Sequence, residues 1–99
     1  MITPEKIQKQ CDLLADLLKR KNADYGDSFS ERPYLLPNVT TNTSAYIRLS
    51  DKFHRLRTLL NIEEPDRKVD ETIEDTLRDI AGYCLLLLAD CGKEGAKEE

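Results

Sequence analysis

The chain has 99 residues, of which 39% are hydrophobic and 34% are charged, and its formal net charge is −4 at pH 7. A chain of this length forms one domain with a modest core, and its acidic balance argues against direct binding to nucleic acid. Its longest apolar run, residues 84–89, is far shorter than the roughly 20 residues of a membrane span, and no signal peptide opens the chain. We therefore expect a cytoplasmic protein that does not bind membranes.

The first predicted helix covers residues 4–21, with Thr3 as N-cap and Pro4 at the first helical position. Its apolar residues follow the period of an amphipathic helix. They are Ile7, Cys11, Leu14 and Leu18. Three cations, residues 19–21, suit the negative end of the helix dipole, so we expect the helix to end there.

A long connector follows, from Asn22 to Thr43, with no sustained periodicity. Connectors longer than about 12 to 15 residues are usually functional or disordered. This one holds half of the six aromatic residues of the chain, namely Tyr25, Phe29 and Tyr34. Because aromatic side chains in a loop need a surface to lie on, we expect the connector to pack over a site.

The second predicted helix begins between Thr43 and Ala45 and ends near Asn61, and the third covers residues 69–91. Gly92 is expected to end the third helix, which leaves residues 93–99 as a disordered charged tail. The C-terminal part of the third helix is apolar nearly all round, so we expect a neighbouring subunit there. The predicted fold is all-α: one domain over residues 1–92, with three helices, a long connector between the first two, and a helical bundle completed by homo-oligomerisation.

Three cysteines, Cys11, Cys84 and Cys91, are widely spaced and lie in apolar surroundings. An odd number at such spacing is typical of reduced thiols that serve as small hydrophobic residues, not of a disulfide framework or a zinc site. His54 is the only histidine, and we interpret it as a helix-surface residue, with proton transfer near phosphates as the alternative. Any metal would therefore be bound by oxygen ligands.

Three carboxylates, Glu71, Asp75 and Asp79, lie four residues apart and would share one face of a helix. Like charges at this spacing repel one another, so the row predicts a positive group beside it. One interpretation is Mg²⁺, which binds carboxylate oxygens and substrate phosphates. The other is an ion-pair network with the basic face of the second helix.

That basic face consists of Arg48, Lys52 and Arg55, which recur at the spacing of one helix side. It is either a solvated face or a set of phosphate ligands, for which arginine supplies paired donors and lysine a point charge. The segment 21–29 is interpreted as a turn, with a binding role as the alternative. In that role Gly26 would allow a ligand to approach closely, Tyr25 would stack on a base, and Asp24 would cap the turn or bind metal.

Three ordered motifs carry a resemblance to a known family. They are KNADYGDSF at residues 21–29, RLSDKFHRL at 48–56 and ETIEDTLRDIAGY at 71–83. Over residues 21–88 the chain resembles the nucleotide-modification-associated domain 1 family, which is common in phages and prophages. The third motif is more distantly similar to the second metal-binding helix of MazG-like all-α nucleotide pyrophosphatases, which include dimeric dUTPases.

This resemblance implies a helical bundle built across subunits that cleaves nucleoside triphosphates to monophosphate and pyrophosphate with Mg²⁺. Asp75 matches the terminal aspartate of the second metal motif, and Glu71 takes the place of a preceding acid, while Thr72 stands where a glutamate is usual. The first metal motif, with two adjacent glutamates and a third one turn later, is replaced here by Asp51, Lys52 and Arg55.

The leading functional hypothesis is a Mg²⁺-dependent nucleotide-phosphate hydrolase, acting in the host cytoplasm if a phage encodes it. Its catalytic residues would be Asp75 and Glu71, and its metal ligands Glu71, Asp75, Asp79 and Asp51. Its substrate-binding residues would be Lys21, Asp24, Tyr25, Gly26, Arg48, Lys52 and Arg55. The expected partners are a nucleoside triphosphate and further copies of the chain, as a homodimer or homotetramer. The alternatives are a non-catalytic protein that binds or sequesters a nucleotide, and a small helical protein that inhibits a host factor.

Overall fold

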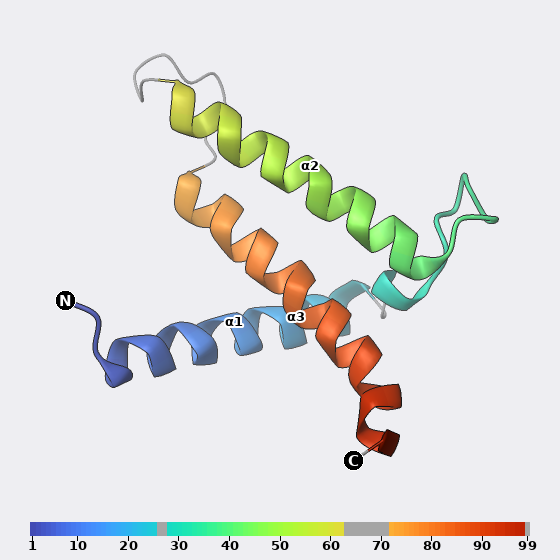
Figure 1. Cartoon of the computed structure of the whole chain (residues 1–99), viewed down its shortest axis with the longest axis horizontal. Helices are drawn as coiled ribbons and strands as arrows, with labels where there is room; N and C mark the ends of the chain where they lie inside the picture. Colours follow the sequence, from blue (N-terminus) through green and yellow to red (C-terminus); the bar gives the residue numbers. More distant parts are fainter. Residues whose placement is uncertain (26–27, 63–71, 99) are drawn as a thin grey trace. The chain divides into compact units, whose positions relative to one another are not determined.

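The computed structural model describes residues 1–25, 28–62 and 72–98, with side chains described for 1–23, 29–62 and 72–90. The elements in chain order are α1 (Pro4–Tyr25), the 3₁₀ helix η1 (Ser28–Ser30), α2 (Thr41–Asn61) and α3 (Ile73–Glu98), and the described ranges contain no strand (Figure 1). The predicted all-α fold, with three helices and a long connector between the first two, is therefore confirmed. None of the described helices combines the length and the apolar character needed to cross a membrane.

The chain forms two compact units, Met1–Glu31 and Arg32–Glu99. In the first unit, the Thr3 hydroxyl accepts a hydrogen bond from the Lys6 backbone N–H at 3.2 Å, as expected for the N-cap of α1. The helix continues to Tyr25, four residues beyond the predicted end. Residues 22–25 contain no glycine or proline, and a residue such as Asn22 costs an α-helix only a few tenths of a kcal/mol, so nothing in this stretch ends the helix.

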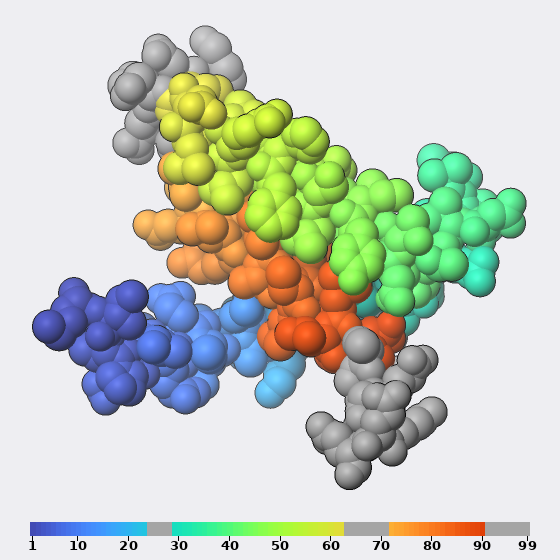
Figure 2. All heavy atoms as spheres, in the orientation of Figure 1, coloured from blue at the N-terminus to red at the C-terminus, as the bar shows by residue number. Residues whose placement is uncertain are grey.

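In the second unit, α2 and α3 lie side by side and antiparallel (Figure 1). The side chains of the two helices meet along their shared length (Figure 2). Most of the buried residues at this contact are small. Buried side chains are those of Ser44, Ala45, Leu59 and Thr76, and Gly82 is buried as well. Small residues allow two helix backbones to approach closely, so a narrow seam holds the unit together.

Large apolar side chains remain exposed on both helices of this unit. They include Tyr46, Phe53 and Leu60 on α2 and Leu77, Leu85 and Leu88 on α3. Two helices packed against each other cover only one stripe of each, and the remaining apolar surface faces solvent. The expected completion of the bundle by further copies of the chain stays a prediction.

The connector between η1 and α2 is an ordered loop. The Leu36 N–H donates to the Pro33 carbonyl at 3.2 Å, and the Arg32 guanidinium donates to the Pro37 carbonyl at 3.1 Å. Phe29 is half-buried, but the side chain of Tyr34 is 96% exposed. Local turns thus hold this loop in place without a covering contact from the Tyr34 ring, and the expectation that the connector packs over a site stays a prediction.

Both helices of the second unit begin at a threonine cap. The Thr40 hydroxyl accepts from the Thr43 N–H at 3.2 Å, so α2 begins at Thr41 and not at residues 43–45 as predicted. Thr72 plays the same part for α3, which begins at Ile73, later than the predicted start at residue 69. Residues 69–71 of that prediction lie outside the described residues.

At its other end, α3 continues past Gly92 to Glu98, where the sequence predicts a disordered tail. A glycine inside a helix costs only about 1 kcal/mol relative to alanine. Gly95 adds a second such cost, but the other residues after Gly92, namely Lys93, Glu94, Ala96 and Lys97, are good helix formers. Cys11 and Cys84 are free thiols, as predicted, but both are exposed and not buried as small hydrophobic residues. The side chain of Cys91 lies outside the described part.

We expect Thr72→Ala to lower the free energy of unfolding by about 1 kcal/mol, because it removes the N-cap of α3. Chemical denaturation followed by circular dichroism measures this. Thr58→Ala is the matched control, since the Thr58 hydroxyl only donates to the His54 carbonyl within α2. An equal loss of stability in both variants would contradict the capping role of Thr72.

Candidate functional site

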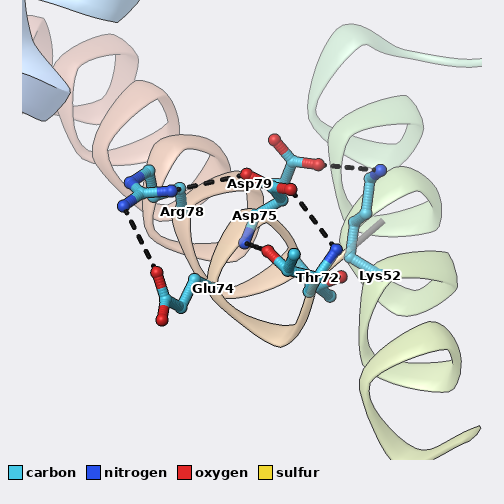
Figure 3. A network of polar contacts seen from close by, with 7 residues as sticks. Lys52, Thr72, Glu74, Asp75, Arg78 and Asp79 are labelled. Carbon is cyan, nitrogen blue, oxygen red and sulfur yellow. Dashed lines mark hydrogen bonds and ion pairs between the residues drawn. The ribbon is translucent and has the colours of Figure 1, made fainter. Parts of the chain in front are cut away.

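The start of α3 is organised by a reciprocal pair of hydrogen bonds between Thr72 and Asp75 (Figure 3). The Asp75 N–H donates to the Thr72 hydroxyl at 3.0 Å, and the Thr72 N–H donates to the Asp75 Oδ2 at 3.3 Å. This is a capping box, which satisfies backbone donors that the first turn of a helix otherwise leaves unpaired. The carboxylate of Asp75 is therefore held in one orientation at the N-terminus of α3.

The same contacts keep Asp75 ionised. The Thr72 hydroxyl, the Thr72 backbone N–H and, to a smaller extent, the Arg78 guanidinium hold the pKa of Asp75 below its usual range. Arg78 lies on the next turn, with Nη1 at 3.4 Å from the Asp75 Oδ1 and Nη2 at 3.9 Å from Glu74. A carboxylate with a lowered pKa carries its negative charge throughout the neutral pH range.

An ion pair joins the next acid of the row to α2. The Lys52 Nζ lies 2.9 Å from the Asp79 Oδ2, and the two side chains are only 22% and 28% exposed. In Figure 3, Lys52 extends from α2 toward Asp79, one turn beyond Asp75 on α3. Of the two interpretations of the acid row, the ion pair with the basic face of α2 is thus present at Asp79.

The structure places the other predicted residues as follows. On α2, Arg48 is half-buried, while Arg55 and Asp51 are exposed, and Arg55 makes further interactions within the chain. Lys21 is exposed on α1, in the first unit. Asp24 and Tyr25 are described only as the last turn of α1, and Gly26 and Glu71 lie outside the described residues.

The structure therefore brings together Lys52, Asp79, Thr72, Asp75 and Arg78 on two helices. Of these, Thr72 and Arg78 were not predicted as site residues. The signal for Thr72 was present, because Thr-x-x-Asp before an apolar helix is the pattern of a capping box. Arg78 lies three residues beyond Asp75, a spacing at which side chains on a helix meet.

The donors present suit Mg²⁺ in chemistry, since ionised carboxylates are the oxygen ligands that it prefers. Among the described residues, however, no three His, Cys, Asp or Glu side chains gather in a group that could hold a metal ion. Asp75 and Asp79 each have a cationic partner as well. The described site is thus a cluster of mixed charge at the contact between α2 and α3.

Comparison with models of known protein families shows to which family the chain belongs. Residues 21–90 match the model of nucleotide modification associated domain 1. The chain belongs to this family. The match covers all of α2 and α3 as far as Asp90, so it includes every residue of the described charge cluster. No match is found among the curated proteins or among the solved structures, and the distant similarity to MazG-like pyrophosphatases stays a prediction.

We expect a double-mutant cycle with Lys52→Ala and Asp79→Ala to give a coupling free energy of about 1 kcal/mol, at the upper end for surface pairs, because both partners are partly removed from water. The pair between Arg20 and Asp16 on α1 is the control. It has a similar distance, 3.0 Å, but its side chains are 67% and 66% exposed, so its coupling should be about 0.3 to 0.5 kcal/mol. Equal couplings in the two cycles would show that the helix contact adds nothing to the Lys52–Asp79 pair.

A second prediction concerns pH. Because the pKa of Asp75 is lower in the folded than in the unfolded chain, its ionised form adds stability above its ordinary pKa of 3.8. That contribution is lost as the pH falls through the folded-state pKa. Thr72→Ala should raise the pKa of Asp75 toward the ordinary value, as measured by NMR titration of its carboxyl carbon, whereas Thr58→Ala should leave it unchanged. An unaltered pKa in Thr72→Ala would contradict the assigned cause.

Proposed function

We propose that this protein binds the phosphate groups of a nucleoside triphosphate on the basic face of α2 and hydrolyses the nucleotide with Mg²⁺, giving monophosphate and pyrophosphate. The observation that carries the proposal is the 2.9 Å contact between Lys52 and Asp79. It joins one cation of the basic face of α2 to one acid of the α3 row, and this proximity supports a site that binds both phosphate and metal. The family description, which refers to nucleotide modification, supports a nucleotide as the ligand.

The basic face has the chemistry to hold phosphates. Arg48 and Arg55 each present a planar guanidinium, which can donate two parallel hydrogen bonds to a phosphate. The Lys52 ammonium has three N–H donors, so it can bind a phosphate oxygen while it keeps its bond to Asp79. Because Arg48 and Lys52 are half-buried, part of the cost of removing a cation from water has been met before a ligand arrives.

On the acidic side, Glu71, Asp75, Asp79 and Asp51 are the residues that would hold Mg²⁺. When bound, the metal would neutralise phosphate charge and lower the pKa of a water molecule. Asp75 suits this role because it is ionised and its orientation is fixed by Thr72. From the sequence motif alone, Lys21 is expected to hold phosphate, Tyr25 with Gly26 to shape a base pocket, and Asp24 to cap a turn or bind metal. A role in phage nucleotide metabolism in the host cytoplasm belongs to this same proposal.

A second candidate is nucleotide binding without hydrolysis. It is favoured by the cations that already contact the acids, since Arg78 lies against Asp75 and Lys52 against Asp79. Each of these contacts competes with a metal ion for the carboxylate. In this candidate the protein would bind or sequester a nucleotide, with a phosphate group meeting the basic face of α2 alone.

The test is thermal unfolding with a panel of nucleoside triphosphates, with and without Mg²⁺, together with an assay for released pyrophosphate. A ligand at 100 times its dissociation constant should stabilise the fold by about 2.7 kcal/mol. Stabilisation with Mg²⁺-dependent pyrophosphate release supports the hydrolase, and stabilisation without release selects the second candidate. No stabilisation by any nucleotide would overturn both and favour a helical interaction protein.

Variants make the test specific. Arg48→Gln with Arg55→Gln should weaken binding at least tenfold, because two phosphate ligands are removed. Arg57→Gln is the matched control: it also changes an arginine of α2, but Arg57 lies nine residues beyond Arg48 and therefore half a turn away around the helix. Asp75→Asn keeps an oxygen for the cap but removes the charge, and it should abolish hydrolysis while binding persists.

A further inference from the structure

Arg48 differs from the other partly buried cations in having no partner. Among the residues whose side chains are described, three arginines and lysines are half-buried, namely Arg48, Lys52 and Arg78. Lys52 and Arg78 each contact a carboxylate of α3. The Arg48 guanidinium makes no ion pair and donates no hydrogen bond in the described part of the chain. A charge partly removed from water costs free energy unless an opposite charge lies beside it, so Arg48 is the cation that gains most from a bound anion.

Two acids lie within reach of this part of α2, and neither meets the charge of Arg48. Asp51 stands three residues beyond Arg48, a spacing at which side chains on a helix can meet, but no ion pair joins them in the described structure. Asp79 on α3 is held by Lys52 at 2.9 Å. An anion that neutralises Arg48 must therefore come from a ligand.

Tyr83 of α3 lies at the same level as Arg48 along the contact between the two helices. The helices are antiparallel, and Lys52 meets Asp79 (Figure 1). Arg48 stands four residues before Lys52, and Tyr83 stands four residues after Asp79. In antiparallel helices these two steps lead in the same direction, about 6 Å along the axis from the ion pair. Both side chains are half-buried, as expected for residues at the helix contact.

The hydroxyl of Tyr83 also has no hydrogen-bond partner in the described structure. A tyrosine hydroxyl that is partly removed from water usually has one. A phosphate group accepts hydrogen bonds from a guanidinium and from a hydroxyl, whereas a neutral base would leave the charge of Arg48 unmet. We infer that Arg48 and Tyr83 together form the subsite for a phosphate group of the ligand. This inference rests on the proposed function for the identity of the ligand, and it adds a binding residue from α3.

The inference also ranks the cations of the basic face. Lys52 is held by Asp79, and Arg55 makes further interactions within the chain, so a phosphate must share these two cations with the protein. Arg48 has no such competitor in the described structure. The phosphate is therefore bound most strongly at the Arg48 end of the face, one helical turn from the Lys52–Asp79 pair.

The test is isothermal titration calorimetry with inorganic triphosphate and with the panel of nucleoside triphosphates, in the presence of Mg²⁺. Tyr83→Phe removes only the hydroxyl oxygen. It should weaken binding of both kinds of ligand about tenfold, because a hydrogen bond to a charged group is lost. Tyr46→Phe is the matched control. Tyr46 is 60% exposed and lies two residues from Arg48, about 200° away around α2, so both affinities should stay unchanged.

Single arginine variants test the ranking. Arg48→Gln should weaken binding of inorganic triphosphate more than Arg55→Gln does, and Arg57→Gln should leave it unchanged. Thermal unfolding without ligand separates binding from folding. Neither Arg48→Gln nor Tyr83→Phe should lower the midpoint, because each removes a group that has no partner within the described chain.

The outcomes separate this inference from the proposed function. If the parent chain binds both kinds of ligand and Tyr83→Phe binds them equally well, the subsite is wrong and the proposed function stands. The same holds if Tyr83→Phe weakens binding of nucleotides but not of inorganic triphosphate, since the hydroxyl would then contact the base or the sugar. A lower midpoint of ligand-free Tyr83→Phe would assign the hydroxyl to the fold and also overturn the subsite. No binding of any of these compounds by the parent chain would overturn both proposals.

Discussion

The ion pair between Lys52 and Asp79 joins the two helices on which the candidate site depends. It lies where α2 and α3 approach closely, beside a seam made mostly of small residues such as Ala45 and Gly82. A seam of that kind offers few large side chains to set how far one helix is shifted along the other. The partly buried ion pair constrains the position of α3 along α2 more strongly than these small residues do. If one helix moved by one turn, both charges would lose their partner. The pair thus fixes which residues of α2 lie beside the acids of α3.

Asp75 combines a structural role in the cap with properties that suit a carboxylate for binding a ligand. As part of the cap it satisfies a backbone N–H at the start of α3, and the same contacts keep its pKa low. A carboxylate fixed in this way loses little freedom when it binds a ligand, which favours a site. The cations near it act in the opposite direction, since a metal ion must compete with Arg78 for the same oxygens. The balance between orientation and competition decides whether this acid row binds a metal or only pairs with α2.

Much of this architecture can be predicted from the sequence, because long amphipathic patterns and threonine caps are local signals. The three helices follow from such patterns, and the opposition of a basic face on α2 to an acid row on α3 follows from spacing. The ends of helices are harder to predict from the sequence. The apolar pattern of the third helix begins at Val69, whereas Thr72 caps a helix that starts at Ile73. Spacing also left open which basic residue meets which acid. That choice depends on the position of α3 along α2, which the contact of Lys52 with Asp79 sets and no local pattern encodes.

The distribution of charge along α3 separates two kinds of surface on one helix. Its first turns carry Glu74, Asp75, Arg78 and Asp79, and its next ten residues carry no charge. Charged groups retain hydration and meet ligands at an exposed edge, whereas an uncharged row with small residues loses little by leaving water. A chain with so few buried residues in its described part gains most from covering the second kind of surface, since each buried methylene adds about 0.8 kcal/mol. Because the charged residues lie on the first turns of α3 and the uncharged row follows them, the charge cluster and the apolar surface occupy different parts of the helix.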